Sequence, residues 1–210
     1  MLKKNKTLVI VVSIVTLLPI LAGVILWNQL PESMPTHWNA AGEIDGWSSK
    51  PFAVFGTPCI MVAALWACIF ATYADPKREA HNNKVYQLVL WIIPVLSVVV
   101  HTFMYATALG MEVQVEVIMP VLMGLLFTII GNYLPKCKQN YTIGIKIPWT
   151  LNNEENWNRT HRFAGWLWTA CGLMIMLTGF FGGFWIFFAI VLLMVLAPVI
   201  YSYILHRRGF

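Results

Sequence analysis

Histidine and carboxylate side chains gather in one polar stretch between two long hydrophobic runs. Residues 34–50 read MPTHWNAAGEIDGWSSK, with His37, Glu43 and Asp45 close together in the chain. Imidazole nitrogens and carboxylate oxygens are ligands for zinc and other divalent ions. The remaining candidate ligands are His101, Glu112 and Glu116. Their spacing matches no local metal-binding motif, so the sequence favours hydrogen bonding within the stretch and predicts no metal or cofactor.

A second group of titratable residues offers acid–base chemistry. His161 lies near Glu154, Glu155 and Arg162 in the sequence. Such a cluster is more typical of a solvated helix start than of a catalytic site. The chain has no H-E-x-x-H, no G-x-S-x-G and no clear pair of carboxylates within an apolar run. The sequence therefore predicts a protein that is not an enzyme.

The elements that must position these residues are membrane helices. Hydrophobic residues make up 59% of the 210-residue chain and charged residues 11%, whereas soluble chains carry about 25% charged residues. A helix needs about 20 apolar residues to cross a bilayer core. Six runs meet this length: Thr7–Trp27, Phe52–Tyr73, Val85–Leu109, Val113–Leu134, Phe163–Phe181 and Phe184–Leu205.

Basic residues indicate the orientation. With the N-terminus in the cytoplasm, 13 of the 14 lysines and arginines fall on the cytoplasmic side, and only Lys50 falls outside. The positive-inside rule favours this arrangement, with both ends in the cytoplasm. Because the basic residues flank the spans, the net charge of +5 indicates contact with anionic lipid and no direct nucleic-acid partner.

The chain is therefore predicted to be a single all-α, multi-pass membrane domain, residues 1–210. Two connections exceed ordinary turns: the outer loop, residues 28–51, and the inner loop, residues 135–162, both named for the predicted orientation. Loops of this length are usually functional or disordered, and the tryptophans in both favour order. Five spans contain a proline, a residue that tends to kink a helix. The sequence favours a role for these kinks in shaping the helix bundle over a role as gating hinges. In the fifth, Gly165, Gly172 and Gly179 predict close helix packing.

The outer loop is predicted to fold back as a small cap. Trp38 and Trp47 flank its turn residues and suit the headgroup region. The Asp45-Gly46 pair predicts a tight turn with positive φ. Lys50 is placed to extend toward the headgroups from the start of the second span.

The inner loop leads into the fifth span. Residues 141–168 read YTIGIKIPWTLNNEENWNRTHRFAGWLW, in which Gly144 and Pro148 bracket a short extended piece. Asn152, followed three residues later by Glu155, resembles a capping box. The sequence predicts an interfacial helix that runs on into the span.

Two stretches resemble the SdpI-type membrane proteins of bacteria. The inner GIKIPWTLNNEENWNRTHRFAG is similar to the family signature G-I-R-T-P-W-T-L followed by W and H-R-x-A-G. The outer PTHWNAAGEIDGWSSK is similar to a small module often found ahead of that signature. Lys146 and Ile147 depart from the arginine and threonine often found there, and lysine lacks arginine's bidentate fork. The matching inner positions are Gly144, Ile145, Pro148, Trp149, Thr150, Leu151, Trp157, His161, Arg162, Ala164 and Gly165.

This resemblance implies immunity and signal transduction: resistance to a secreted antimicrobial peptide toxin, and sequestration of a cytoplasmic winged-helix repressor at the membrane. The rival interpretations are a transporter of small molecules or peptides and a metal-dependent membrane protein of unknown role. The predicted toxin-binding residues are His37, Trp38, Asn39, Asp45, Trp47 and Lys50. The predicted repressor-binding residues are Gly144, Lys146, Pro148, Trp149, Thr150, Trp157, His161 and Arg162.

Overall fold

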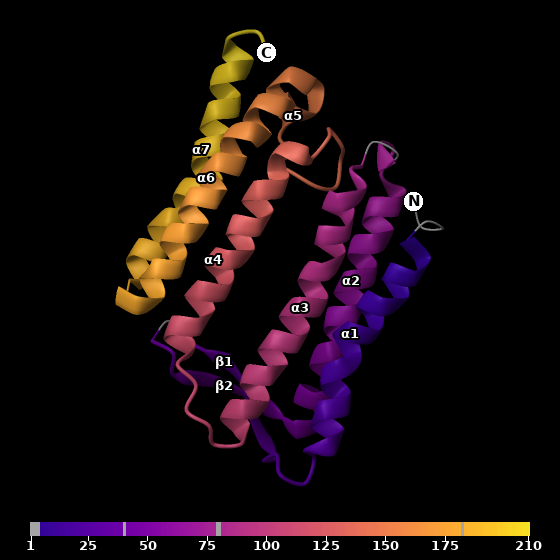
Figure 1. The fold of residues 1–210 in the computed structure, drawn as a ribbon, viewed down its shortest axis with the longest axis vertical. Helices are drawn as coiled ribbons and strands as arrows, with labels where there is room; N and C mark the ends of the chain where they lie inside the picture. The colour runs from indigo at the N-terminus through magenta and orange to yellow at the C-terminus, as the bar shows by residue number, and fades with distance from the viewer. Residues whose placement is uncertain (1–4, 40, 79–80, 182) are drawn as a thin grey trace. The chain divides into compact units, whose positions relative to one another are not determined.

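The computed structural model describes residues 5–39, 41–78, 81–181 and 183–210 (Figure 1). Long helices dominate, with one β-hairpin between the first two. The elements are α1 (Lys6–Ile25), β1 (Ser33–Trp38), β2 (Ile44–Ser49), the π-helical turn η2 (Phe52–Gly56), α2 (Thr57–Ala74), α3 (Asn83–Ala108), α4 (Val115–Tyr133), the 3-10 turn η4 (Leu134–Lys136), α5 (Pro148–Asn152), α6 (Glu154–Phe181) and α7 (Phe184–Arg207).

The six predicted spans are confirmed. In the described part of the chain, six helices are long and apolar enough to cross a membrane. Their ends agree with the predicted ends to within two residues, except that the fifth begins at Glu154, because the interfacial helix and the span form one continuous helix. The chain is a multi-pass cell-membrane protein. Its orientation stays a prediction, and Lys3 and Lys4 lie outside the described residues.

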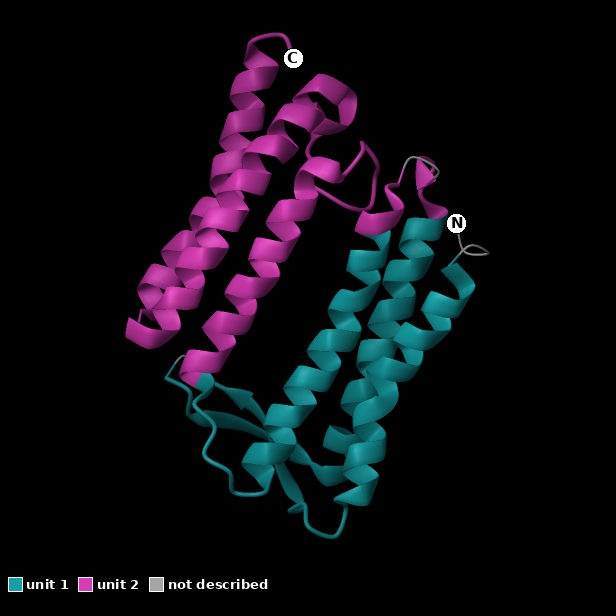
Figure 2. Ribbon diagram, viewed as in Figure 1, with its two compact units in different colours: residues 1–73, 86–115 teal, residues 74–85, 116–210 magenta. Residues whose placement is uncertain are grey.

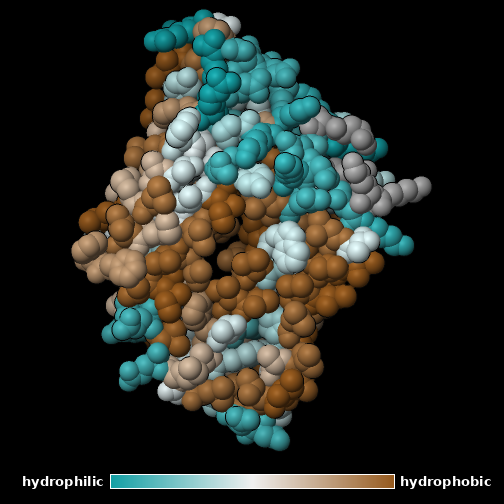
Figure 3. All heavy atoms as spheres, viewed as in Figure 1, coloured by the Kyte–Doolittle hydropathy of each residue, from teal (hydrophilic) through white to brown (hydrophobic). Residues whose placement is uncertain are grey.

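The helices expose large apolar side chains, as lipid-facing helices must. Phe181 and Trp185 are 83% and 77% exposed. In Figure 3 hydrophobic residues cover the visible helix faces, and hydrophilic residues gather over the inner loop. Water would oppose such exposure, whereas lipid tails accept it.

Contacts divide the chain into two units (Figure 2). Unit 1 comprises residues 1–73 and 86–115, and unit 2 comprises residues 74–85 and 116–210. Each unit has its own buried clusters, one around Met34, Val54 and Tyr105 in unit 1 and one around Cys171 and Met194 in unit 2. A single membrane domain stays a prediction.

In unit 1, several buried polar side chains form hydrogen bonds with neighbouring helices. Ser97 donates to the carbonyl of Thr16 at 2.8 Å, and the Tyr105 hydroxyl donates to the carbonyl of Pro19 at 3.0 Å. His101 is buried and contacts the Thr57 hydroxyl at 2.8 Å and the Ser97 carbonyl at 2.7 Å. These bonds replace water for groups that would otherwise be unpaired in a membrane helix.

In unit 2, the glycines of α6 allow close contact with α4, which confirms their predicted packing role. A Cβ added at Gly172 would lie 2.6 Å from the carbonyl oxygen of Gly124, and one at Gly179 would lie 2.7 Å from the carbonyl oxygen of Val117. A Cβ at Gly165 would meet the ring of Pro135 at 2.6 Å. Larger residues would therefore separate the two helices.

The outer loop forms an antiparallel hairpin that its sequence did not predict. β1 pairs with β2, the Asn39 N–H donates to the Glu43 carbonyl between the strands, and Gly42 there has φ 80°. The predicted Asp45-Gly46 turn is wrong, because both residues lie within β2. Gly46 pairs with His37 at an irregularity in the register, where a Cβ would come within 2.7 Å of the His37 Cβ. The glycine permits close strand approach there.

Candidate functional site

The inner loop is folded around the buried carboxylate of Asp75, which directly follows α2. The backbone N–H groups of Lys77 and Tyr141 donate to it at 2.7 and 2.9 Å, and the Thr142 hydroxyl donates at 2.9 Å. His81 Nε2 lies 3.3 Å away. Burial alone would raise the pKa of Asp75, but these donors outweigh it and lower the pKa below its usual 3.8. The charged carboxylate thus ties the turn between α2 and α3 to the inner loop.

Asn140 shapes the next part of the loop. Its side-chain oxygen accepts from the backbone N–H groups of Thr142 and Ile143, and its amide donates to the carbonyls of Lys138 and Ile143. The side chain is buried, so these bonds replace its contacts with water. Asp75 and Asn140 were not predicted, because an acidic residue and an asparagine beside helix ends usually indicate solvated turns.

The signature residues Gly144, Trp157 and His161 form one buried unit. The Ile145 N–H donates to His161 Nε2 at 2.9 Å, so Nδ1 carries the proton that is donated to the Trp157 carbonyl at 2.8 Å. The Trp157 indole donates to the Cys137 carbonyl and stacks on the His161 ring at 4.0 Å. Gly144 has φ 122°, and a Cβ there would lie 2.5 Å from His161 Nε2. These three residues position the loop.

The buried side chain of Thr150 fixes the start of α5. Its hydroxyl oxygen accepts from the Ile147 N–H at 3.1 Å and lies 2.8 Å from the Ile145 carbonyl. The predicted capping box at Asn152 is off by one residue, because Asn153 caps α6 by accepting from the Asn156 N–H at 2.9 Å. Glu155 instead pairs with Arg159 at 2.6 Å.

Pro148 and Trp149 lie at the surface of this framework. They line a cavity of about 420 Å³ together with Asn152, Asn153, His206, Gly209 and Phe210. Trp149 stacks on the His206 ring, with centroids 5.8 Å apart and planes at 15°. Its indole N–H is buried and has no hydrogen-bond partner in the described structure. Lys146 is exposed nearby in the chain. This set offers a rigid, partly exposed aromatic ring beside an exposed lysine.

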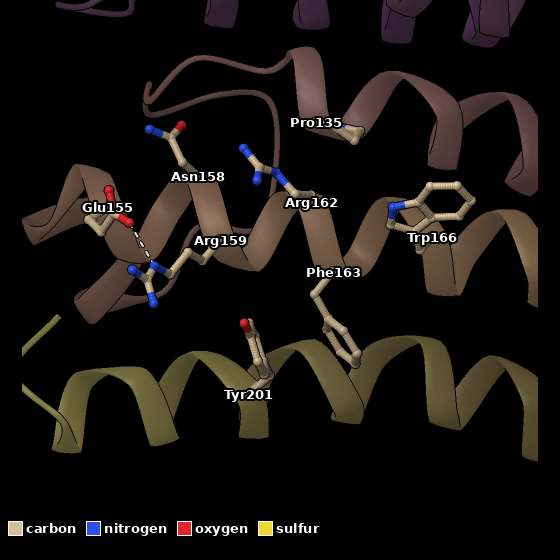
Figure 4. Close-up of a pocket in the computed structure, with 8 residues that line it drawn as sticks. All are labelled: Pro135, Glu155, Asn158, Arg159, Arg162, Phe163, Trp166 and Tyr201. Atoms are coloured by element: carbon tan, nitrogen blue, oxygen red, sulfur yellow. Dashed lines mark hydrogen bonds and ion pairs between the residues drawn. The ribbon is translucent and has the colours of Figure 1, made fainter.

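Arg162, the remaining predicted residue of the inner loop, lies in a second cavity (Figure 4). This groove has a volume of about 600 Å³ and is lined by Pro135, Glu155, Asn158, Arg159, Arg162, Phe163, Trp166 and Tyr201. Pro148 and Trp149 are not among its lining residues. Asn158, Arg159 and Trp166 were not predicted as site residues. Their four-residue spacing with Arg162 and Glu155 could have indicated a shared helix surface.

The hairpin presents a different set of side chains. His37 pairs with Asp45 across the strands, and Asn39 donates to Glu43 at 2.9 Å in the turn. His37, Asp45 and Trp47 are exposed, whereas Trp38 packs partly against the Met34 cluster.

Lys50 does not extend to the headgroups as predicted. Its side chain is buried, donates to the Trp27 carbonyl at 3.2 Å and pairs with Glu32 at 2.8 Å. The pairing and the Trp27 ring, 5.1 Å away, hold the ammonium against the hairpin base.

The weak metal candidates do not come together among the described residues. No three histidine, cysteine, aspartate or glutamate side chains there could hold a metal ion. His37 and Asp45 form a pair, and His101 is engaged inside unit 1. The hairpin polar groups satisfy one another, as the hydrogen-bonding interpretation predicted.

Comparisons with known proteins give a family match for each of the two stretches that carry the resemblance. Residues 136–202 match the SdpI/YfhL protein family, and residues 14–62, which include the hairpin, match a domain of unknown function, DUF1648. Immunity protein SdpI of Bacillus subtilis (strain 168) is 29% identical over 205 residues, covering 95% of this chain and 92% of that protein. No solved structure gives a significant match. The resemblance predicted from the sequence is thereby confirmed: this membrane protein is similar to the SdpI/YfhL family over residues 136–202 and to an SdpI immunity protein over most of its length.

Proposed function

We propose that the protein gives its cell resistance to a secreted antimicrobial peptide toxin and, once toxin is present, sequesters a cytoplasmic winged-helix repressor at the membrane. The observation that carries this proposal is the similarity to an immunity protein over nearly the full length of both chains. That similarity includes the outer hairpin as well as the inner loop, so it supports a sensing part and a responding part together. The proposed action is binding within the bilayer, without catalysis.

The proposed toxin contact is the exposed surface of the hairpin. His37, Asp45 and Trp47 project from paired strands, so their positions are fixed before any ligand binds. Such preorganisation lowers the entropy lost on binding. Trp38 and Asn39 support this surface, from the hairpin core and the turn. Lys50 is buried and supports this surface indirectly, because its bond to the Trp27 carbonyl holds the base of the hairpin in place.

The proposed repressor contact is formed by the exposed residues Lys146 and Pro148 and the half-buried Trp149. Tryptophan often dominates interface energetics, and proline restricts the local backbone. Gly144, Thr150, Trp157 and His161 are assigned a positioning role, because their side chains are buried or, for glycine, closely covered. Coupling requires that the protein have two states with different affinities for toxin and repressor.

Expression in a toxin-sensitive strain that lacks its own protector tests the proposal. Wild-type protein should restore growth in the toxin, and Trp47→Ala should restore it less, because a large exposed contact is lost. The matched control is Trp185→Ala, which removes another exposed tryptophan, at the start of α7; the exposed fractions are 77% for Trp185 and 56% for Trp47. Growth that the wild-type protein fails to restore, at a verified membrane abundance, would refute the immunity assignment for the toxin used.

A further inference from the structure

The groove around Arg162 combines an unneutralised positive charge with an aromatic wall. Glu155 already pairs with Arg159 at 2.6 Å, so the lining carries one charge without a counterion. Arg162 itself makes no hydrogen bond or ion pair with any described residue. Guanidinium groups bind phosphate through two parallel hydrogen bonds. The groove therefore fits a ligand with one negative charge.

The lining residues come from two neighbouring rows of α6. Asn158, Arg162 and Trp166 follow one another at four-residue spacing, and Glu155, Arg159 and Phe163 follow the same spacing beside them (Figure 4). Tyr201 of α7 closes one side by stacking on Phe163 at 4.6 Å, and Pro135 lies on the other side. Polar lining thus changes to aromatic lining along the helix.

The depth of the groove matches the headgroup layer of a bilayer. At 1.5 Å per residue, the stretch from Arg162 to the helix end at Phe181 is about 30 Å long, which is the thickness of the hydrocarbon core. Arg162 then lies where the hydrocarbon ends, and Trp166, one turn deeper, is 77% exposed to the surroundings. Tryptophan and arginine at this level are typical of lipid contact.

We propose that this groove binds the headgroup of an anionic phospholipid, with the phosphodiester on Arg162 and the acyl chains along Trp166 and Phe163. Asn158 and the Tyr201 hydroxyl supply further donors for the headgroup. A free phosphate would use only the polar half of the groove. A cytoplasmic protein would have to reach a side chain at the edge of the hydrocarbon. The lipid alone matches both the charge and the aromatic half.

The test is lipid binding by the purified protein in an uncharged detergent, with neither toxin nor repressor present. Short-chain phosphatidylglycerol is titrated and the lipid-bound fraction is measured by native mass spectrometry, with phosphatidylcholine and inorganic phosphate as comparisons. Phosphatidylglycerol should bind more tightly than phosphatidylcholine. Arg162→Gln should weaken phosphatidylglycerol binding about tenfold, equivalent to about 1.4 kcal/mol, and Arg162→Lys should weaken it less.

The matched control is Arg207→Gln, which removes an exposed charge at the end of α7 outside the groove. It should change binding by less than about twofold. Asn158→Asp is a second variant for the case that Arg162→Gln does not fold; it adds a negative charge to the groove and should also weaken binding.

Three results would overturn the proposal. Equal losses in Arg162→Gln and Arg207→Gln would indicate nonspecific surface charge. Competition by inorganic phosphate as strong as that by the lipid would indicate a free-phosphate site. Unchanged lipid binding in Arg162→Gln, with lost repressor recruitment in cells, would assign Arg162 to the protein partner. Because no toxin or repressor is used in the binding measurement, its failure leaves the immunity proposal to its own test.

Discussion

Protonation of Asp75 is expected to make the stability of the inner loop depend on pH. Its lowered pKa means that the folded state favours the carboxylate, so this stabilisation is present above about pH 4 and is lost as pH falls through the lowered value. Asp75→Asn should lower the free energy of unfolding at pH 7 by about 1–3 kcal/mol, because a buried acceptor loses its charge. Chemical unfolding at several pH values measures this. The difference from wild type should shrink as pH falls through the lowered pKa of Asp75.

The control for that measurement is Glu112→Gln, which neutralises an exposed carboxylate outside the helices. It should change the free energy of unfolding at pH 7 by less than about 0.5 kcal/mol, as is usual for a surface substitution. An Asp75→Asn curve parallel to wild type across the acidic range would mean that this carboxylate does not stabilise the inner loop through its charge.

Trp149, which is half-buried, is the side chain with the largest predicted effect on signalling. Truncation of a dominant interface tryptophan costs about 2 kcal/mol, which weakens capture about thirtyfold. Trp149→Ala should therefore reduce recruitment of the repressor while toxin resistance survives. Co-isolation of the repressor with membranes, at equal abundance of both variants, measures this. Trp185→Ala is the matched control. Recruitment that is the same in all three proteins would exclude Trp149 from the partner surface.

Side-chain roles in the inner loop were only partly predictable. The signature identified Gly144, Trp157 and His161, but spacing alone cannot distinguish a residue that contacts a partner from one that holds the loop. That distinction depends on burial, which arises from contacts distant in sequence, such as the Trp157 bond to Cys137. Asp75 was missed for the same reason, since two of its partners, Tyr141 and Thr142, lie more than 60 residues further along the chain.

Among the elements, the contact between α4 and α6 makes the sharpest prediction. A Leu side chain at Gly172 has no space, since even a Cβ would lie 2.4 Å from the Thr128 hydroxyl oxygen. Gly172→Leu should lower the free energy of unfolding by about 1–3 kcal/mol or more. Unfolding in detergent measures it. Gly183→Ala is the control, because its Cβ would meet only ordinary contacts at 3.4 Å. A stability near wild type for Gly172→Leu would contradict this helix contact.

The helices were predictable from sequence, whereas the hairpin was not. Membrane spans follow from hydropathy over about 20 residues, a signal long enough to fix each end closely. The hairpin strands are six residues each and carry one proline, two tryptophans and an aspartate, without a clear alternation of apolar and polar residues. The Asp45-Gly46 pair has the composition of a turn. In the structure Gly46 lies within β2, where its missing side chain leaves room for His37 on the opposite strand.

For the whole molecule, the predicted orientation can be measured directly. A cysteine at Ala41 should react with a membrane-impermeant maleimide added to intact cells, and one at Asn152 should react only after the membrane is opened. Both positions are exposed. The reverse pattern would contradict the assignment of both ends to the cytoplasm. Background from Cys137 should be low, because burial raises the pKa of its thiol to about 11.

The buried position of Lys50 affects how the outer face of the protein responds to extracellular proteases. Trypsin-like proteases cleave after lysine or arginine, and Lys50 is the only such residue on the predicted outer side. Its side chain is held under the hairpin, and the next residue is Pro51, which resists such cleavage. In the predicted orientation, the outer face therefore offers these enzymes no ready cutting site. A cell that shares its surroundings with secreted proteases would keep this surface intact.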